Sequence, residues 1–265
     1  MPWWNDEDWI DPSQWMVSCI EVMGTTHDMC WVMNTVTGES GLFKPESHWR
    51  KSAYCEYAAS KIAQSLNIPS AKVIVGDFRG KPGCISFDVR KGCADRVVTG
   101  DALYNCGNLV NFEESKGSAV AYGRPDELSF LGLLPFLQRG AEISLVQMMF
   151  FDCITRNSGR HPSNFSFAID SRPAISGLLP LYDHGWCIQE NRFMRGGSAF
   201  GYYGPSSFHR SFPFDSLYEC MLRDYPELIE TMVEKAYSSE FKETTEKLEC
   251  YGFIMRRIES FQKLK

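Results

Sequence analysis

The stretch FDCITRNSGRHPSN at positions 151–164, answered downstream by YDHG at positions 182–185, decides the fold. The first stretch ends an apolar segment and then turns polar, and the second follows another short apolar run. Asn164 and Asp183 supply an amide oxygen and a carboxylate, which are the oxygen ligands that a hard cation such as Mg²⁺ prefers. The alternative is structural, with Asn164 capping a turn and Asp183 ending a strand. Their occurrence together in this order favours the metal ligands.

Composition bounds the class of protein. The chain has 265 residues, of which 44% are hydrophobic and 14% aromatic, as in a globular protein. This length is enough for one large domain or two lobes. The formal net charge of -6 argues against electrostatic nucleic-acid binding, which needs clustered Lys and Arg. A nucleotide is compatible with this charge, because it needs only a few local cations.

No targeting or membrane segment is evident. The N-terminal stretch carries acids where a secretory signal would carry basic residues, and no window approaches the roughly 18 apolar residues of a membrane span. The ten cysteines are scattered singly, without a Cys-x-x-Cys pair. These features predict a cytoplasmic protein in a reducing compartment, with secretion as an effector left as an alternative.

The first ninety residues alternate short apolar runs with turn residues. This pattern predicts strands, a helix after the third strand, and a Gly/Pro turn at 80–82. The strands are expected at 16–23, 29–36, 41–44, 71–77 and 83–89, and the helix at 53–66. Such a set of elements indicates a small antiparallel lobe that ends near Phe87 and Val89.

The rest of the chain has a helical character. Residues 92–118 and 192–213 are expected to be largely irregular, and 165–169 and 178–182 to form a hairpin. Helices are expected at 127–137, at 144–154, and from 214 to the end with breaks near Pro226 and Ser238. We therefore predict an α+β fold of two lobes, with a β-rich N-lobe (1–88), an α-helical C-lobe (89–265) and a cleft between them. The loops at 151–164 and 182–185 resemble those of a two-lobed protein-kinase-like fold.

The chain offers, in order, most groups that phosphoryl transfer from ATP requires. Lys44 ends an apolar strand and is a candidate phosphate contact, and Glu56 on the next helix is its candidate partner. The turn Gly24-Thr25-Thr26-His27 could present backbone N–H groups to phosphates. The structural alternatives are a solvated lysine, an acid in the first helical turn favoured by the helix dipole, and an ordinary glycine turn.

The missing group is the catalytic acid. Asn164 lies five residues after position 159, the spacing that separates acid and asparagine in His-Arg-Asp-x-x-x-x-Asn, and position 159 is glycine. Asp183 begins Asp-His-Gly, analogous to the metal-binding Asp-Phe-Gly. His161 and His184 suggest a metal pair or a general base, but loop-shaping hydrogen bonds are the favoured interpretation.

Two further residues beside this loop are candidates for structural roles. Arg160 is expected to steady the loop or to contact an acid. Asp152 is expected to brace the loop, or to reach the site as a replacement acid.

The segments 41–45, 56–63, 157–164 and 182–185 resemble the HipA-like kinases, which are bacterial protein kinases distantly similar to phosphatidylinositol kinases. The resemblance implies that Lys44 contacts the phosphates of ATP and that Glu56 positions Lys44. It further implies that Asn164 and Asp183 hold Mg²⁺, and that residues 24–27 form the phosphate loop. The family's catalytic aspartate falls at Gly159.

The same resemblance implies a nucleotide site that includes Phe87 and Val89, a Ser/Thr hydroxyl on a protein as acceptor, and an antitoxin-type partner. Neither a nucleic-acid ligand nor a membrane span is expected. Because glycine has no side chain to act as a base, Gly159 predicts impaired transfer. Three functions stay open: a protein kinase, a nucleotide-binding pseudokinase, and a lipid kinase, against which the acidic balance weighs.

Overall fold

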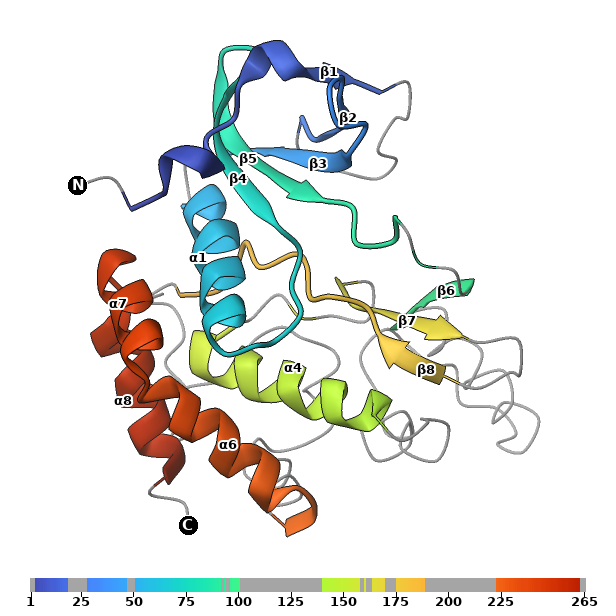
Figure 1. Cartoon of the computed structure of the whole chain (residues 1–265). Coiled ribbons are helices and arrows are strands. Elements are labelled where there is room, and N and C mark those ends of the chain that lie inside the picture. The colour runs from blue at the N-terminus through green and yellow to red at the C-terminus, as the bar shows by residue number, and fades with distance from the viewer. Residues whose placement is uncertain are drawn as a thin grey trace, which may run out of the picture.

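A computed structural model describes residues 3–18, 28–46, 51–91, 93, 96–100, 140–157, 160, 164–169, 175–188 and 223–262. An antiparallel sheet forms one lobe, and helices with a small second sheet form the other (Figure 1). The predicted α+β, two-lobed arrangement is confirmed.

The N-lobe sheet has the spatial order β1-β2-β3-β5-β4, and all of its neighbouring strands are antiparallel. Two short 3₁₀ helices, η1 (Asp6–Asp8) and η2 (Pro12–Gln14), precede it. Helix α1 (Ser52–Ser65) connects β3 to β4. The strands are β1 (Trp15–Val17), β2 (Cys30–Asn34), β3 (Ser40–Pro45), β4 (Val73–Phe78) and β5 (Lys81–Phe87).

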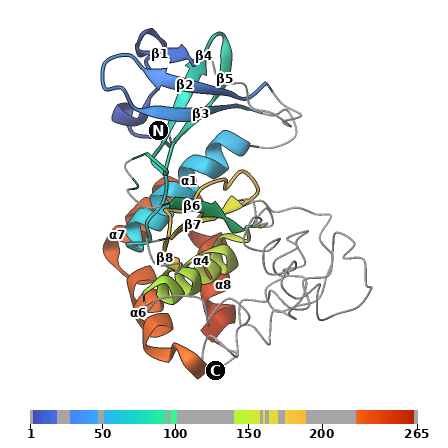
Figure 2. The ribbon, with the colours of Figure 1, turned by 90° about the vertical axis from the view of Figure 1, so that its right-hand side faces the viewer.

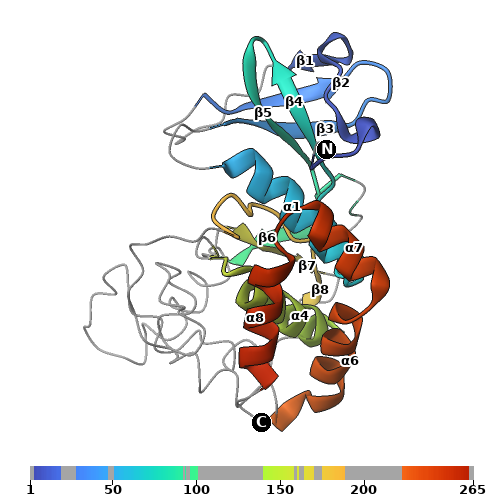
Figure 3. The ribbon, with the colours of Figure 1, turned by 90° about the vertical axis from the view of Figure 1, so that its left-hand side faces the viewer.

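Each face of this sheet covers its own apolar core. Alternate residues of a strand point to opposite faces, so Val73 and Val75 join the core beneath α1 whereas Ile74 joins a smaller cluster with Val32 and Phe43. We expected α1 to pack against the strand that ends at Lys44, but it packs mainly on β4, β5 and the C-lobe helix α7 (Ser239–Lys247). Helix α1 therefore lies between the sheet and the C-lobe (Figures 1 and 3).

The described part of the C-lobe combines helices with a second antiparallel sheet of order β6-β7-β8. Helix α4 packs against β8 and α8, while α7 contacts α1. Figure 2 shows the small sheet between α1 and the lower helices. The remaining elements are β6 (Arg96–Thr99), α4 (Ala141–Thr155), β7 (Ser166–Ile169), β8 (Ile175–Leu178), α6 (Pro226–Ala236) and α8 (Tyr251–Gln262).

Several element boundaries differ from the sequence prediction. The tight turn is Arg79–Gly80, with φ of 53° and 73°, so Lys81 and Pro82 already belong to β5. Residues 96–99 form β6 inside a segment expected to be irregular. The hairpin is confirmed, but its second strand is 175–178 rather than 178–182. The expected helix 127–137 and loop 192–213 lie outside the described residues.

The N-terminal segment packs along α1. Trp3 makes edge contacts with Tyr54 and Tyr57 at ring-centroid distances of 5.0 and 5.5 Å. The Tyr57 hydroxyl donates to Asp8 (2.8 Å), whose carboxylate also pairs with Lys61. Trp3 therefore packs the N-terminal segment against α1. None of the helices in the described ranges combines the length and apolarity needed to cross a membrane.

Candidate active site

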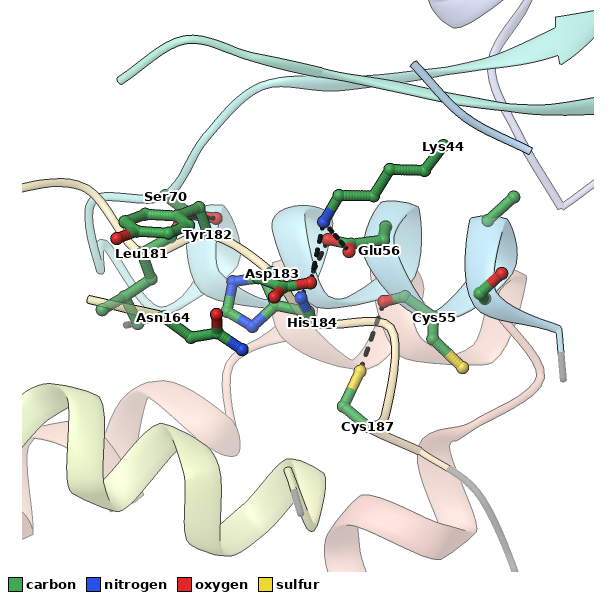
Figure 4. A network of polar contacts seen from close by, with 12 residues as sticks. Lys44, Cys55, Glu56, Ser70, Asn164, Leu181, Tyr182, Asp183, His184 and Cys187 are labelled. Atoms are coloured by element: carbon green, nitrogen blue, oxygen red, sulfur yellow. Dashed lines mark hydrogen bonds and ion pairs between the residues drawn. The ribbon is translucent and has the colours of Figure 1, made fainter. Parts of the chain in front are cut away.

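Lys44 bridges two carboxylates that come from different elements (Figure 4). Its Nζ lies 2.5 Å from Glu56 Oε1 on α1 and 2.8 Å from Asp183 Oδ1 in the loop after β8. The predicted Lys44–Glu56 contact is confirmed. Glu56 lies in the second turn of α1 and is 1% exposed, so its interpretation as a first-turn acid favoured by the helix dipole is wrong.

Lys44 and Asp183 each stabilise the ionised form of the other. Burial alone would lower the pKa of the Lys44 ammonium, but the Asp183 and Glu56 carboxylates raise it. Burial would likewise raise the pKa of Asp183, yet Lys44 and then Arg160 lower it to about 2. For Glu56, burial outweighs Lys44 and raises the pKa. With both carboxylates ionised, one cation faces two anions, and the remaining negative charge suits a second cation.

Helix α1 is tied to the loop that carries Asp183. The second carboxylate oxygen of Glu56 accepts a hydrogen bond from the His184 backbone N–H at 2.9 Å. Asp183 has a φ of 58°, in the left-handed region that non-glycine residues seldom adopt. A residue held in this region by its surroundings is common at functional sites.

Arg160 joins the two predicted loops. It is fully buried, and its Nε and Nη2 donate to the two carboxylate oxygens of Asp152 at 2.9 and 3.1 Å. Its Nη1 donates to the carbonyls of Asn164 (2.5 Å) and Tyr182 (2.8 Å). One nitrogen of Arg160 thus links the backbone carbonyl of Asn164 to that of Tyr182, the residue before Asp183. The expected bracing role of Arg160 is confirmed.

Asp152 does not reach the site as a replacement acid. Its side chain is 1% exposed and is held by Arg160 and by the Asn157 amide, which donates at 3.0 Å. A carboxylate paired with a buried guanidinium is not available to take a proton from an acceptor hydroxyl. The interpretation of Asp152 as a brace is correct, and the interpretation as a catalytic substitute is wrong.

His184 is a buried, neutral residue that lies beside the Arg160 guanidinium. Its Nδ1 lies 3.3 Å from Arg160 Nη2, and because a guanidinium only donates, Nδ1 is the acceptor. Burial, followed by the charges of Arg160 and Lys44, lowers the pKa of His184 well below its ordinary value. This environment suits the loop-shaping interpretation rather than that of a general base.

The candidate metal ligands lie on adjacent loops. The Arg160 bonds bring the backbones of Asn164 and Tyr182 together, and Figure 4 shows Asn164 and Asp183 below Lys44. No group of three or more His, Cys, Asp or Glu side chains suited to a metal occurs in the described ranges. A carboxylate and an amide fit Mg²⁺, which usually keeps waters and takes further oxygens from substrate phosphates.

A cavity of about 500 Å³ lies next to this cluster, within the size range of small-molecule sites. The N-lobe sheet and the chain after β5 form one side, and β6, β7 and Tyr182 form the other. Lys44, Phe87 and Val89, all predicted site residues, line it. The remaining lining residues are Trp31, Leu42, Ser86, Asp88, Arg90, Val97, Thr99, Ser166 and Tyr182.

Some of these additional residues had a readable signal. Leu42 precedes Lys44 by two positions and therefore shares its face of β3, and Trp31 is the partner of Leu42 on β2. Other predicted site residues cannot be assessed. The turn residues Gly24, Thr25, Thr26 and His27, together with Gly159 and His161, lie outside the described residues.

The fold is similar to that of solved kinases. A Helicobacter pylori proinflammatory kinase, CtkA, matches with a TM-score of 0.56 and 16% identity, over 89% of this chain and 94% of its own. HipA of Shewanella oneidensis MR-1, solved with HipB and operator DNA, matches with a TM-score of 0.53 and 14% identity. That match covers 98% of this chain and 66% of HipA. No protein-family model matches, and no curated protein is similar in sequence. The chain has a HipA-like kinase fold.

Proposed function

We propose that this protein binds Mg-ATP as a HipA-like kinase, with a Ser/Thr hydroxyl of a protein as the acceptor. The observation that carries the proposal is the Lys44–Glu56–Asp183 cluster beside the cavity. A cation held by one acid from the N-lobe helix and one from the C-lobe loop is the arrangement that positions phosphates in kinases. The similarity of fold to CtkA and HipA supports the same class.

The cavity suits a nucleoside whose phosphates reach Lys44. Within the described residues, no hydrogen bond engages the backbone N–H or C=O of Val89, which leaves a donor and an acceptor for the edge of a base. Leu42, Phe87 and Val97 supply apolar contacts for its faces. The phosphate loop in this proposal is Gly24 to His27, as predicted from the sequence.

Asn164 and Asp183 are the proposed ligands of Mg²⁺. The metal, when bound, neutralises charge on the transferred phosphate. The residues of this chain prepare the position: Lys44 keeps Asp183 ionised, and Arg160 fixes the backbones of both loops. Gly159 supplies no base, so we propose that the chain binds Mg-ATP but transfers phosphate poorly. A pseudokinase that regulates a partner is the second candidate, favoured by Gly159 alone.

The partner in this proposal is a protein of the antitoxin type, by analogy with HipA, which was solved with HipB. The proposed N-lobe is residues 1–88 and the proposed C-lobe is residues 89–265. A cytoplasmic location remains part of the same proposal.

Thermal unfolding of the protein in a titration with Mg-ATP tests the central claim. A ligand that binds only the folded state stabilises it by RT ln(1 + [L]/Kd), so Tm should rise steadily with concentration. An unchanged Tm at millimolar Mg-ATP would contradict nucleotide binding. Phosphate incorporation measured in parallel on protein and lipid acceptors separates the protein kinase from the lipid kinase.

A further inference from the structure

The cavity has a preassembled cation at the end where the chain leaves β5. The Arg90 guanidinium stacks on the Trp31 ring, with its carbon 5.0 Å from the ring centroid. Asp88 holds it from the other direction, because Arg90 Nε donates to Oδ1 at 2.8 Å and Nη2 donates to Oδ2 at 3.1 Å. A bidentate pair fixes the plane of a guanidinium, so this cation has a set orientation.

The segment that carries Arg90 is itself fastened to the N-lobe sheet. The Asp88 N–H donates to the Ser40 carbonyl at 2.9 Å, and the Lys91 ammonium bonds the Gly38 carbonyl. The Arg90 backbone N–H also donates to Asp88 Oδ1 at 3.0 Å. A side chain placed by this many contacts is preorganised, although it is 53% exposed.

The stacked cation retains a donor for a ligand. Nε and Nη2 of Arg90 are used by Asp88, whereas Nη1 has no hydrogen-bond partner in the part of the chain that the structure describes. Trp31, Asp88 and Arg90 all line the cavity. Nη1 is therefore a directed donor at the wall of the cavity with nothing described to receive its hydrogens.

The position along the sheet indicates which part of a nucleotide meets this donor. Leu42 pairs with Trp31 and lies two residues before Lys44 on the same face of β3. Phosphates at Lys44 and a base edge at Val89 put the sugar between them, under Leu42 and Trp31. A sugar hydroxyl accepts a hydrogen bond from a guanidinium, and the Trp31 ring offers an apolar wall to the sugar carbons.

We propose that the Trp31–Arg90 pair recognises the ribose hydroxyls of the bound nucleotide and makes the site selective for ribonucleotides. Arg90 supplies the hydrogen bond, and Trp31 holds the guanidinium in place. This inference rests on the proposed nucleotide-binding function and names residues that the sequence analysis did not assign.

Isothermal titration of ATP, 2′-deoxy-ATP and 3′-deoxy-ATP, each with Mg²⁺, tests the pair. The unaltered protein should bind ATP about tenfold more tightly than at least one deoxy analogue, since a hydrogen bond to a charged group is lost. Arg90→Met should bind all three with nearly equal affinity, close to that of the weaker analogue. Trp31→Ala should lose most of this preference, and Trp31→Phe should lose less of it.

Arg79→Met is the matched control, because Arg79 also lies over an aromatic ring, that of Phe78 at 5.9 Å, but does not line the cavity. It should keep the preference for ATP. Melting curves without ligand show that each variant is folded. ATP and both analogues binding equally to the unaltered protein, or Arg90→Met keeping the full preference, would overturn the inference while leaving nucleotide binding intact. Absence of binding by every form would overturn the proposed function as well.

Discussion

At the residue scale, the Lys44 ammonium is paired with the Asp183 carboxylate, which is the group that a metal ion would need. Its Nζ lies 2.8 Å from Asp183 Oδ1, so an incoming Mg²⁺ competes with an ammonium already in contact. The phosphates of ATP would draw Lys44 away and add their own oxygens. We therefore expect Mg²⁺ and ATP to bind cooperatively, with weak metal binding in the absence of nucleotide.

Lys44→Met should separate these effects. Without the ammonium, no cation of the protein occupies Asp183 Oδ1, so Mn²⁺ used as a probe should bind the nucleotide-free variant about tenfold more tightly than it binds the unaltered protein. ATP should bind it more weakly. Paramagnetic resonance of free Mn²⁺ measures the first effect. Asp183→Ala, which removes a partly exposed ligand and not core volume, should abolish metal binding and remain folded. Equal Mn²⁺ affinity in the Lys44→Met variant and the unaltered protein would refute the competition.

Gly159 carries the second prediction at this scale. A positioned base typically contributes about 10²–10⁴-fold to a rate, and glycine cannot supply it. Gly159→Asp should raise phosphate transfer by a factor in that range and leave Mg-ATP affinity nearly unchanged, since binding depends on other groups. Asp152 cannot substitute, because Arg160 holds it in the interior. A gain that also appears with Gly159→Asn would indicate altered loop geometry rather than a base.

The third prediction concerns the buried ion pair of Arg160 with Asp152. Removing one partner of a buried ion pair leaves the other charge uncompensated and costs about 3–5 kcal/mol. Arg160→Met should lower the free energy of unfolding by this order, in a denaturant titration, because Asp152 stays buried. The double variant Arg160→Met/Asp152→Leu should recover part of the loss. If both forms are equally unstable, the hydrogen bonds to the Asn164 and Tyr182 carbonyls dominate over the charge pair.

At the scale of elements, the sequence predicted the helices and strands whose formation depends on their own residues, and it missed a strand that depends on pairing with a distant segment. Helix α4 coincides with an apolar run of the sequence, and β3 coincides with a short apolar strand pattern that ends at Lys44. Both elements could therefore be predicted from the sequence. Strand β6 was missed because Arg96–Thr99 is short and is made a strand by its pairing with β7, a contact between distant segments. The turn was predicted at 80–82 rather than at Arg79–Gly80 because Pro82 was read as a turn residue, although a proline is tolerated near the start of a strand.

The same distinction applies to the site. The pair Lys44–Glu56 was predicted from strand and helix order, and Asp183 from its motif. The contacts of Arg160 with four different residues, and the stacking of Arg90 on Trp31, depend on how separate segments meet in space. Sequence periodicity holds no information on contacts between separate segments, so the Arg160 contacts and the Trp31–Arg90 pair could not be derived from it.

Glu46 gives a prediction for helix α1. Its carboxylate accepts hydrogen bonds from the backbone N–H groups of Ser52 (2.7 Å) and Ala53 (3.2 Å), which the helix itself leaves unpaired. It also carries a negative charge at the positive end of the helix dipole. Glu46→Ala should destabilise the protein by about 1 kcal/mol, as loss of an N-terminal cap does. Glu46→Gln, which keeps an acceptor, should lose less, and chemical denaturation measures both.

At the scale of the whole molecule, α1 couples the two lobes. One carboxylate, Glu56, contacts Lys44 in the N-lobe sheet and the backbone of His184 in the C-lobe loop. The helix also packs on α7, and its Tyr57 hydroxyl donates to Asp8 of the N-terminal segment. A ligand that contacts Lys44 and Asp183 therefore acts on a connection that already spans the cleft.

Glu56→Gln should weaken this coupling without removing the helix. The amide oxygen can still accept from the His184 N–H, but the ion pair with Lys44 is lost, so the ammonium is held by Asp183 alone. Hydrogen exchange should show that Mg-ATP slows exchange in both 40–46 and 175–188 of the unaltered protein. In the variant, the protection of 175–188 should persist through Asp183, whereas the protection of 40–46 should fall. Mg-ATP should bind the variant about tenfold more weakly, within the range of coupling energies between sites.

Glu39→Gln is the control, because it is a surface change and the Glu39 carboxylate bonds only Thr37 within the described residues. Full protection of both segments in Glu56→Gln would mean that the lobes are coupled by the ligand itself and not through α1.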